Sequence, residues 1–425
     1  MRDYLRRLPG GAVTALGLTQ LIGWGTTFYI PAVLAHVIAA DAGWSLTEVF
    51  AAFSWSLLVA GLTSRRVGRA IDRLGARVVM SAGSAGVVAG LLLLASASHW
   101  LQLFGAWTVL GVAARASQYD AAFAAIAAIE GQRARRAISL ITLWGGLAST
   151  VFWPLGHLLG EALGWRWTIV VYALLNLAVC LPLHLWLLSK SAGTSPSRPE
   201  SGGSPSPPSS PSPSAGQATH ADPLPPPAEG IVQGVARDRA LLVFAAVLAG
   251  YSFVFSALSA HLIVLLQGLG LAAATAVGLS SIKGIAQVGA RFLELVGQRW
   301  FGPIAIGVIA MGLLPLAMLI MLGAPPDPLV LAAATVIYGA ANGLTTIVRG
   351  AVPLALFGHA GYATTLGRIA APGLITASVA PLAFAWVLES FGVRAGLGLL
   401  AAVSLAGLAG MLWLARRPFG TPAGP

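Results

Sequence analysis

The chain has 425 residues, of which 57% are hydrophobic and only 9% are charged. Soluble proteins carry about 25% charged residues because their surfaces face water, so this composition argues against a soluble enzyme. The mean hydropathy is +0.81. The number of apolar residues is close to what roughly twelve membrane-spanning helices of about 20 residues require. The sequence therefore predicts a membrane bundle and little else.

The net charge of +11 comes from 25 Lys and Arg residues against 14 Asp and Glu residues. Membrane proteins gather Lys and Arg in their cytoplasmic loops, so this excess indicates topology and not a nucleic-acid partner. The single cysteine, Cys180, leaves no disulfide framework and no cysteine-based metal site. We expect no metal and no cofactor. No phosphate-binding Gly-x-x-x-x-Gly-Lys loop is found, so an ion gradient is the expected energy source.

Charges, Pro/Gly clusters and span length predict twelve helices in two sets of six. The first set lies near residues 11–38, 46–64, 78–96, 101–127, 138–160 and 167–188. The second set lies near residues 240–266, 271–294, 301–322, 328–354, 366–388 and 394–415. A Pro/Ser-rich segment between the sets predicts a disordered linker over 189–238. The expected domains are a bundle at 1–188, a bundle at 239–417 and a tail at 418–425.

The basic residues also predict the orientation of the chain. With a cytoplasmic N-terminus, almost all basic residues outside the helices fall on the inner side, and only Arg166 and Arg394 fall outside. This predicts a multi-pass protein of a bacterial inner membrane with cytoplasmic termini and linker. The first apolar run is too long for a signal peptide and is expected to be an uncleaved helix. Four basic residues lie inside predicted helices, namely Arg115, Lys283, Arg291 and Arg349.

The loop after the second predicted helix has a specific pattern. Residues 68–77 read Gly-Arg-Ala-Ile-Asp-Arg-Leu-Gly-Ala-Arg. This resembles the Gly-x-x-x-Asp-Arg-x-Gly-x-Arg loop of the major facilitator superfamily, and it lies between helices 2 and 3 as in that family. The resemblance implies an all-α membrane protein with twelve helices in two pseudo-symmetric bundles. It also implies a secondary transporter and not an enzyme.

The residue types of this loop have a physical role. Gly68 permits close helix packing, Gly75 supports a tight turn, and Asp72 can face the positive N-terminal end of another helix. The resemblance implies that the loop latches the first half against helix 11, which is expected to begin near Thr365. The alternative is that the arginines only set topology. The predicted latch residues here are Gly68, Asp72, Arg73, Gly75 and Arg77.

The fourth predicted helix carries a buried arginine. Arg115 and Gln118 resemble the Arg-x-x-Gln-Gly pattern of proton-linked family members, with Tyr119 in place of the glycine. On a continuous helix these three residues share one face. Arg115 would lie about 21 Å into the span, where it needs a cavity or an acidic partner. A role in substrate or proton coupling is expected, and a structural ion pair is the alternative.

Asp120 follows on the same predicted helix. It lies about 140° around a continuous helix from Arg115, so no direct pair between the two is expected. The resemblance to the family implies pairing with a loop arginine such as Arg73 or Arg77 instead, and Asp120 is expected to be either part of a gate or a protonatable site. Arg349, near the inner end of helix 10, is a further candidate for the gate.

The eighth predicted helix has a polar stripe of Lys283, Gln287 and Arg291 at spacings i, i+4 and i+8. Lys283 lies near the midplane, from which its ammonium cannot easily reach the membrane surface, so it should face a cavity or pair with an anion. Arg291 and Glu294, three residues apart, are expected to pair with each other. A cation at this depth would attract a carboxylate, which makes Lys283 the leading candidate for a substrate contact.

The first predicted helix carries Gln20, Trp24, Thr27 and Phe28 at helical spacing, compatible with one stripe that faces a cavity, although packing is the alternative. Residues 23–29 and 43–45 are similar to bacterial relatives of monocarboxylate and oxalate transporters. The predicted substrate-binding or coupling residues are Lys283, Arg115, Gln118, Tyr119, Gln20, Trp24, Phe28 and Gln287.

These observations predict proton-coupled transport of a small organic anion, with a monocarboxylate as the leading substrate, by alternating access. The expected partners are the small-molecule substrate, protons and the lipid bilayer, and the protein is expected to be a monomer. Three alternatives stay open at this point. They are efflux of a hydrophobic drug, uniport of a neutral solute, and a non-transporting membrane receptor with the same fold.

Overall fold

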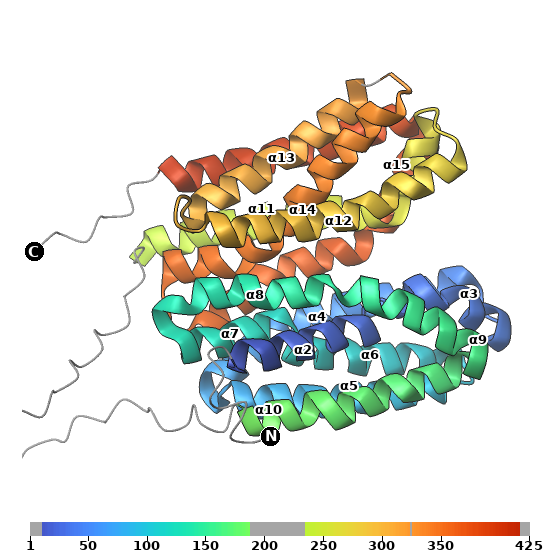
Figure 1. Cartoon of the computed structure of the whole chain (residues 1–425), viewed down its shortest axis with the longest axis vertical. Helices are drawn as coiled ribbons and strands as arrows, with labels where there is room; N and C mark the ends of the chain where they lie inside the picture. The colour runs from blue at the N-terminus through green and yellow to red at the C-terminus, as the bar shows by residue number, and fades with distance from the viewer. Residues whose placement is uncertain (1–10, 188–233, 324, 417–425) are drawn as a thin grey trace, which may run out of the picture.

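The structure, a computed structural model, describes residues 11–187, 234–323 and 325–416 (Figure 1). Within these ranges the regular elements are helices and no strand is present. Residues 189–233 of the predicted linker 189–238 and the tail at 418–425 lie outside the described residues. The described chain forms two helical halves that lie side by side, the N-half at 11–187 and the C-half at 234–416 (Figure 1).

The elements follow in chain order. The N-half contains α2 (Gly11–Thr26), α3 (Ile30–Ala42), α4 (Leu46–Leu74), α5 (Ala76–Ala95), α6 (Trp100–Ser117), α7 (Tyr119–Glu130), the 3-10 turn η1 (Gly131–Arg133), α8 (Ala134–Gly146), α9 (Ala148–Leu175), the π-helical turn η2 (Asn176–Cys180) and α10 (Leu181–Leu187). The C-half contains α11 (Gly234–Gly268), α12 (Ala273–Gly297), α13 (Pro303–Gly323), α14 (Pro328–Phe357) and α15 (Tyr362–Arg416).

The start of α11 corrects one predicted boundary. The helix begins at Gly234, so residues 234–238, which the sequence places in the linker, are helical. This short segment contains no proline after its first glycine, so nothing in it prevents the helix from extending beyond the apolar span.

Short capping motifs in the sequence fix where α4 and α14 begin. Ser45 and Glu48 form a capping box at α4, in which the Glu48 N–H donates to Ser45 Oγ over 3.2 Å and the Ser45 N–H donates to Glu48 Oε2 over 2.8 Å. Asp327 caps α14 by accepting the Leu329 N–H at 2.7 Å, and Pro328 occupies the first turn. These caps satisfy N–H groups that the helix itself leaves unpaired.

Eight stretches of the described chain are long and apolar enough to cross a membrane. One of them, Trp100–Trp186, reverses direction at Gly164, which has φ +77° and ψ 162°. The rings of Phe152 and Tyr172 lie 5.7 Å apart, whereas 20 residues of straight helix would separate them by about 30 Å. α15 contains a similar break at Gly392, with φ +81°. The number of twelve membrane-crossing helices stays a prediction.

The two halves share apolar packing at one end of the molecule. The end of α10, the start of α11 and the end of α15 lie at this end, which we call the linker end, and the opposite end is the far end (Figure 1). One buried cluster at the linker end contains Phe123 and Ile138 of the N-half together with Tyr362 and Leu366 of α15. The other buried clusters of the described chain each draw on one half alone. The halves are therefore closed on each other at the linker end.

The reversal at Gly164 generates a prediction. An alanine there must adopt a backbone conformation that L residues rarely occupy, although no atom lies within 4 Å of its Cβ. We expect Gly164→Ala to lower the free energy of unfolding by about 1–3 kcal/mol. The measurement is reversible unfolding in mixed micelles. The matched control is Gly105→Ala, which also has open space around its Cβ but lies in helical α6. An equal loss of stability in both variants would contradict this explanation.

Candidate functional site

Asp72 caps the start of α15 from the other half of the molecule. Its carboxylate accepts hydrogen bonds from the Ala363 N–H at 3.2 Å, the Thr364 N–H at 2.8 Å and the Thr364 hydroxyl at 2.5 Å. The first N–H groups of a helix lack internal partners and carry partial positive charge, so a carboxylate is favoured there. The contact expected from the sequence is present, and the helix begins at Tyr362 instead of near Thr365.

Small residues let α4 and α15 approach closely beside Asp72. A Cβ on Gly68 would collide with the Ala363 carbonyl, and a Cβ on Gly367 would collide with the Ser64 carbonyl. Close packing at Gly68 agrees with the sequence-based expectation, whereas Gly367 was not anticipated. Its partner is 303 positions away in the chain, so no local pattern could identify it.

The other predicted latch residues do not reach the second half. Gly75 has φ +84° and joins α4 directly to α5, so it makes the expected tight turn. Arg73 and Arg77 have exposed side chains, and within the described part of the chain they form no ion pair. Their assignment to the latch stays a prediction without a contact to support it.

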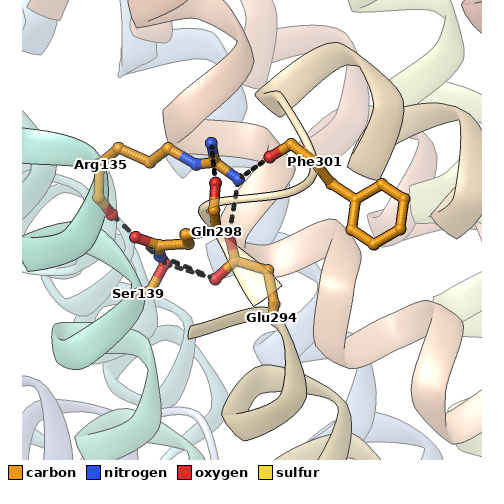
Figure 2. A network of polar contacts seen from close by, with 5 residues as sticks. All are labelled: Arg135, Ser139, Glu294, Gln298 and Phe301. Atoms are coloured by element: carbon orange, nitrogen blue, oxygen red, sulfur yellow. Dashed lines mark hydrogen bonds and ion pairs between the residues drawn. The ribbon is translucent and has the colours of Figure 1, made fainter. Parts of the chain in front are cut away.

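A second polar network joins α8 to the end of α12 (Figure 2). The fully buried Glu294 pairs with Arg135 at 3.2 Å and accepts the Ser139 hydroxyl at 2.7 Å. Gln298 donates to Ser139 Oγ at 2.8 Å and to Glu294 Oε2 at 3.0 Å. Arg135 also donates to the Phe301 carbonyl at 2.6 Å, just beyond the end of α12. Glu294 therefore connects the two halves, and its carboxylate and the Arg135 guanidinium each have a partner of opposite charge.

This network corrects the prediction that Glu294 pairs with Arg291. Glu294 turns to the other half, where Arg135 offers a guanidinium that also satisfies carbonyl groups at the end of α12. A signal for Glu294 is present in the sequence. The spacing of Ala290, Glu294, Gly297 and Arg299 repeats that of Gly68, Asp72, Gly75 and Arg77, so each half has a small residue, an acid, a glycine and an arginine at equivalent positions.

Asp120 forms a third connection between the halves. It pairs with Arg115 of α6 and with Arg349 of α14. The direct pair with Arg115 was not expected, and the prediction was wrong because it assumed a continuous helix. The helix breaks at Gln118, whose extended backbone (φ −88°, ψ −163°) separates α6 from α7 and brings the two side chains together. The expected partners Arg73 and Arg77 do not contact Asp120.

The charges around Asp120 do not cancel. Arg115 and Asp120 are both buried, at 8% and 4% exposure, and two arginines share one carboxylate. One positive charge therefore remains at this cluster. Arg115 belongs to this linking cluster between the halves, so its predicted direct contact with substrate stays untested.

Five of the predicted site residues gather beside the break at Gln118. The Gln118 amide donates to Thr27 Oγ1 over 2.8 Å, and the Gln20 amide donates to the Ser117 carbonyl over 3.1 Å. The Trp24 ring lies 5.0 Å from Tyr119 and 5.2 Å from Phe28, centre to centre. The expected stripe on the first helix is interrupted, because α2 ends at Thr26 and α3 begins only at Ile30. The gathered residues are Gln20, Trp24, Phe28, Gln118 and Tyr119.

The polar stripe of α12 lies in the C-half. Gln287 accepts a hydrogen bond from the Asn342 amide at 2.9 Å, and Asn342 accepts one from the Tyr251 hydroxyl. The Lys283 ammonium lies 5.7 Å from the centre of the Tyr338 ring. Among the described residues Lys283 has no carboxylate partner. Ile285, 76% exposed, lies on the opposite side of α12, so the stripe faces the interior of the bundle.

Arg291 at the end of this stripe contacts the N-half. Its Nη1 donates to the Thr142 carbonyl of α8 at 2.7 Å, and its Nη2 donates to Thr346 Oγ1 at 3.0 Å. The Tyr119 hydroxyl donates to the same Thr142 carbonyl at 3.4 Å. Arg291 is 2% exposed and, within the described chain, only neutral oxygens bind it. The stripe of the C-half and the cluster of the N-half therefore meet at Thr142.

The arrangement suits binding and conformational change better than covalent chemistry. No group of three or more His, Cys, Asp or Glu side chains that could hold a metal occurs in the described part of the chain. Three carboxylates, Asp72, Asp120 and Glu294, instead connect the halves at the linker end. Two cations of α12, Lys283 and Arg291, lie deeper in the bundle without a carboxylate.

The close crossing of α4 and α15 gives a prediction. We expect Gly367→Ala to prevent full closure of the linker end, because its Cβ collides with backbone and not with a movable side chain. In a Cys180→Ser background, Ile138→Cys should then react with a thiol reagent at least several-fold faster, since Ile138 is buried at the closed end. The control is Gly312→Ala, whose Cβ meets only Leu408 at 3.8 Å. Equal labelling rates in both variants would exclude this role for Gly367.

The buried pair in Figure 2 gives another prediction. A double-mutant cycle with Arg135→Ala and Glu294→Ala should yield a coupling of about 1–3 kcal/mol in unfolding free energy, because each single change leaves a charge without its partner. The same cycle with Arg136→Ala, an exposed residue without an ion pair in the described chain, should give a coupling near zero. Similar couplings in the two cycles would show that the pair does not act as a specific link.

Comparison with known proteins identifies a family and two similar folds. Residues 15–325 match a family model described as Major Facilitator Superfamily. The fold is similar to the crystal structure of the human organic anion transporter MFSD10 (TETRAN), with a TM-score of 0.70 and 17% identity over 95% of this chain and 100% of that chain. It is also similar to the proton:xylose symporter XylE, with a TM-score of 0.68 and 12% identity over 96% of this chain and 95% of that chain. No curated protein sequence matches the chain.

Proposed function

The chain belongs to the Major Facilitator Superfamily of secondary transporters, and on that premise we propose that it carries a small organic anion across the membrane in step with protons. A monocarboxylate is the simplest such substrate. Alternating access then requires a binding site between the halves and a gate on each side of it. The stripe of α12 and the cluster beside Gln118 supply candidate groups for this site.

The observation that carries the proposal is the uncompensated charge on α12. Lys283 and Arg291 lie two helical turns apart on one face, and no described carboxylate pairs with either. A cation held away from water without an anion is unfavourable by several kcal/mol, which an anionic substrate would offset. Gln287 lies between them and its amide can donate a further hydrogen bond. A carboxylate is a fitting ligand for such a row of donors.

The closed linker end supports an assignment of the conformation. The distribution of basic residues favours a cytoplasmic linker end, and on that basis we assign the structure to the outward-facing state of an inner-membrane protein. The substrate would then enter from the far end and meet Lys283 first, because Lys283 lies nearer to the start of α12 than Arg291 does.

Substrate binding can act on the gate through Arg291. A carboxylate is a stronger acceptor for a guanidinium than a backbone carbonyl is. An anion bound to the stripe would therefore compete with the Thr142 carbonyl for Arg291 and weaken one link between the halves. A proton on Asp120 would remove the carboxylate that holds Arg115 and Arg349. Substrate and proton would thus favour the same change of state.

The two similar structures are compatible with this proposal but contribute little to it. One is an organic anion transporter and the other a proton:xylose symporter. At these identities they share the fold alone, so the anion assignment rests on the residues of α12.

The proposal is tested by measuring ligand binding and substrate exchange with the purified protein. A thermal-shift screen should find stabilisation by small carboxylates such as acetate, lactate, benzoate and oxalate, and the best of these is then used in proteoliposome counterflow. We expect Lys283→Ala to lower the counterflow rate at least about tenfold, the effect of losing roughly 1.4 kcal/mol of interaction. Lys283→Arg, which keeps the charge, should retain more activity than Lys283→Ala.

Three outcomes would contradict the proposal. Stabilisation by sugars or hydrophobic cations in place of carboxylates would favour a neutral-solute uniporter or a drug exporter. Binding of carboxylates without counterflow would favour a receptor. Failure of an imposed pH gradient to drive the carboxylate into proteoliposomes above its equilibrium level would exclude proton coupling.

A further inference from the structure

The linker end of α4 has a second polar face besides the one that meets α15. Arg66, Arg69 and Arg73 line a hollow of about 380 Å³ together with Ala70 and Leu74. At 100° per residue these arginines lie about 100–160° around the helix from Gly68. They therefore point away from the contact with α15.

Along α4, these arginines lie at the level expected for the membrane surface. From Leu46 at the start of α4 to Arg66 the helix rises about 30 Å, which equals the usual thickness of the hydrocarbon layer. Arg69 and Arg73 follow within the next two turns. The hollow therefore begins where hydrocarbon gives way to phosphate groups at the linker end.

The charge of the hollow is not compensated within the described chain. Its three arginines are exposed and form no ion pair with a described carboxylate. Asp72 is the acidic residue closest in sequence, and its oxygens bind the start of α15. The apolar Ala70 and Leu74 also line the hollow beside the arginines, and Leu74 is 62% exposed. The hollow thus combines a cationic rim with an apolar surface.

We propose that this hollow binds the phosphate group of an anionic phospholipid in the leaflet at the linker end. Guanidinium groups bind phosphate oxygens in a bidentate manner, and Leu62, one turn before Arg66 and 58% exposed, lies at the depth of the first acyl carbons. Arg69 and Arg73 lie on the same turns as Gly68 and Asp72, so a bound headgroup holds the segment of α4 that closes against α15. The site needs no substrate and is independent of the anion proposed for α12.

The test uses the full-length protein in detergent at fixed ionic strength. Dioleoyl-phosphatidylglycerol, dioleoyl-phosphatidylcholine and inorganic phosphate are added separately, and the melting temperature and the lipid retained in native mass spectrometry are measured. Phosphatidylglycerol should stabilise the wild type, and phosphatidylcholine and inorganic phosphate should not. The variant Arg66→Gln/Arg69→Gln/Arg73→Gln should bind phosphatidylglycerol at least about tenfold more weakly, since it loses every guanidinium that lines the hollow.

A matched control removes three other exposed arginines at the linker end, Arg133→Gln/Arg136→Gln/Arg239→Gln, and should respond to phosphatidylglycerol as the wild type does. If the triple variant of the hollow does not fold, the single Arg69→Gln variant should bind phosphatidylglycerol several-fold more weakly than the wild type. Equal phosphatidylglycerol binding in the hollow variants and the control would overturn the proposal. Equal stabilisation by inorganic phosphate alone would overturn the assignment to lipid.

Discussion

Glu294 is held at the centre of the closed linker end by groups from both halves. Its carboxylate takes the Arg135 guanidinium and the Ser139 hydroxyl from α8, and Gln298 from its own helix (Figure 2). Separation of the halves takes each of these buried charges from its partner, and water at the linker end would have to replace that partner. The same constraint applies to Asp120, whose partner Arg349 lies in the other half. Closure of this end therefore depends on buried carboxylates that gain an arginine partner from the other half.

The remaining contacts at the linker end follow from this constraint. Asp72 binds the N–H groups at the start of α15 only if α4 approaches closely, and Gly68 and Gly367 permit that approach. The apolar cluster around Phe123 and Ile138 then fills the space between the charged links. At the far end the buried clusters belong to one half each. The closed linker end is what alternating access requires of one of the two gates.

Most of the architecture could be predicted from the sequence. Composition, span length and the pattern at 68–77 indicated the family and the two halves, and the contact of Asp72 with α15 followed from the same pattern. Two predictions that inferred pairing along one chain segment were wrong. The break at Gln118 changed the geometry between Arg115 and Asp120, and Glu294 pairs with Arg135 of the other half instead of with Arg291. A third prediction, drawn from the family resemblance, was that Asp120 pairs with Arg73 or Arg77, whereas it pairs across the interface with Arg349. Spacing within one segment alone does not show which side chains of the other half it meets, and the contact of Asp72 could be predicted because the similar loop of the family makes it.

The central claim is that carboxylates at the linker end hold one state of a two-state carrier. Pulsed electron paramagnetic resonance tests it with spin labels in a Cys180→Ser background, one pair at the linker end (Leu74 and Trp300) and one pair at the far end (Trp100 and Leu329), all exposed. Asp72→Asn/Glu294→Gln should lengthen the linker-end distance and shorten the far-end distance. An unchanged linker-end distance, or a change of the same sign at both ends, would contradict the account.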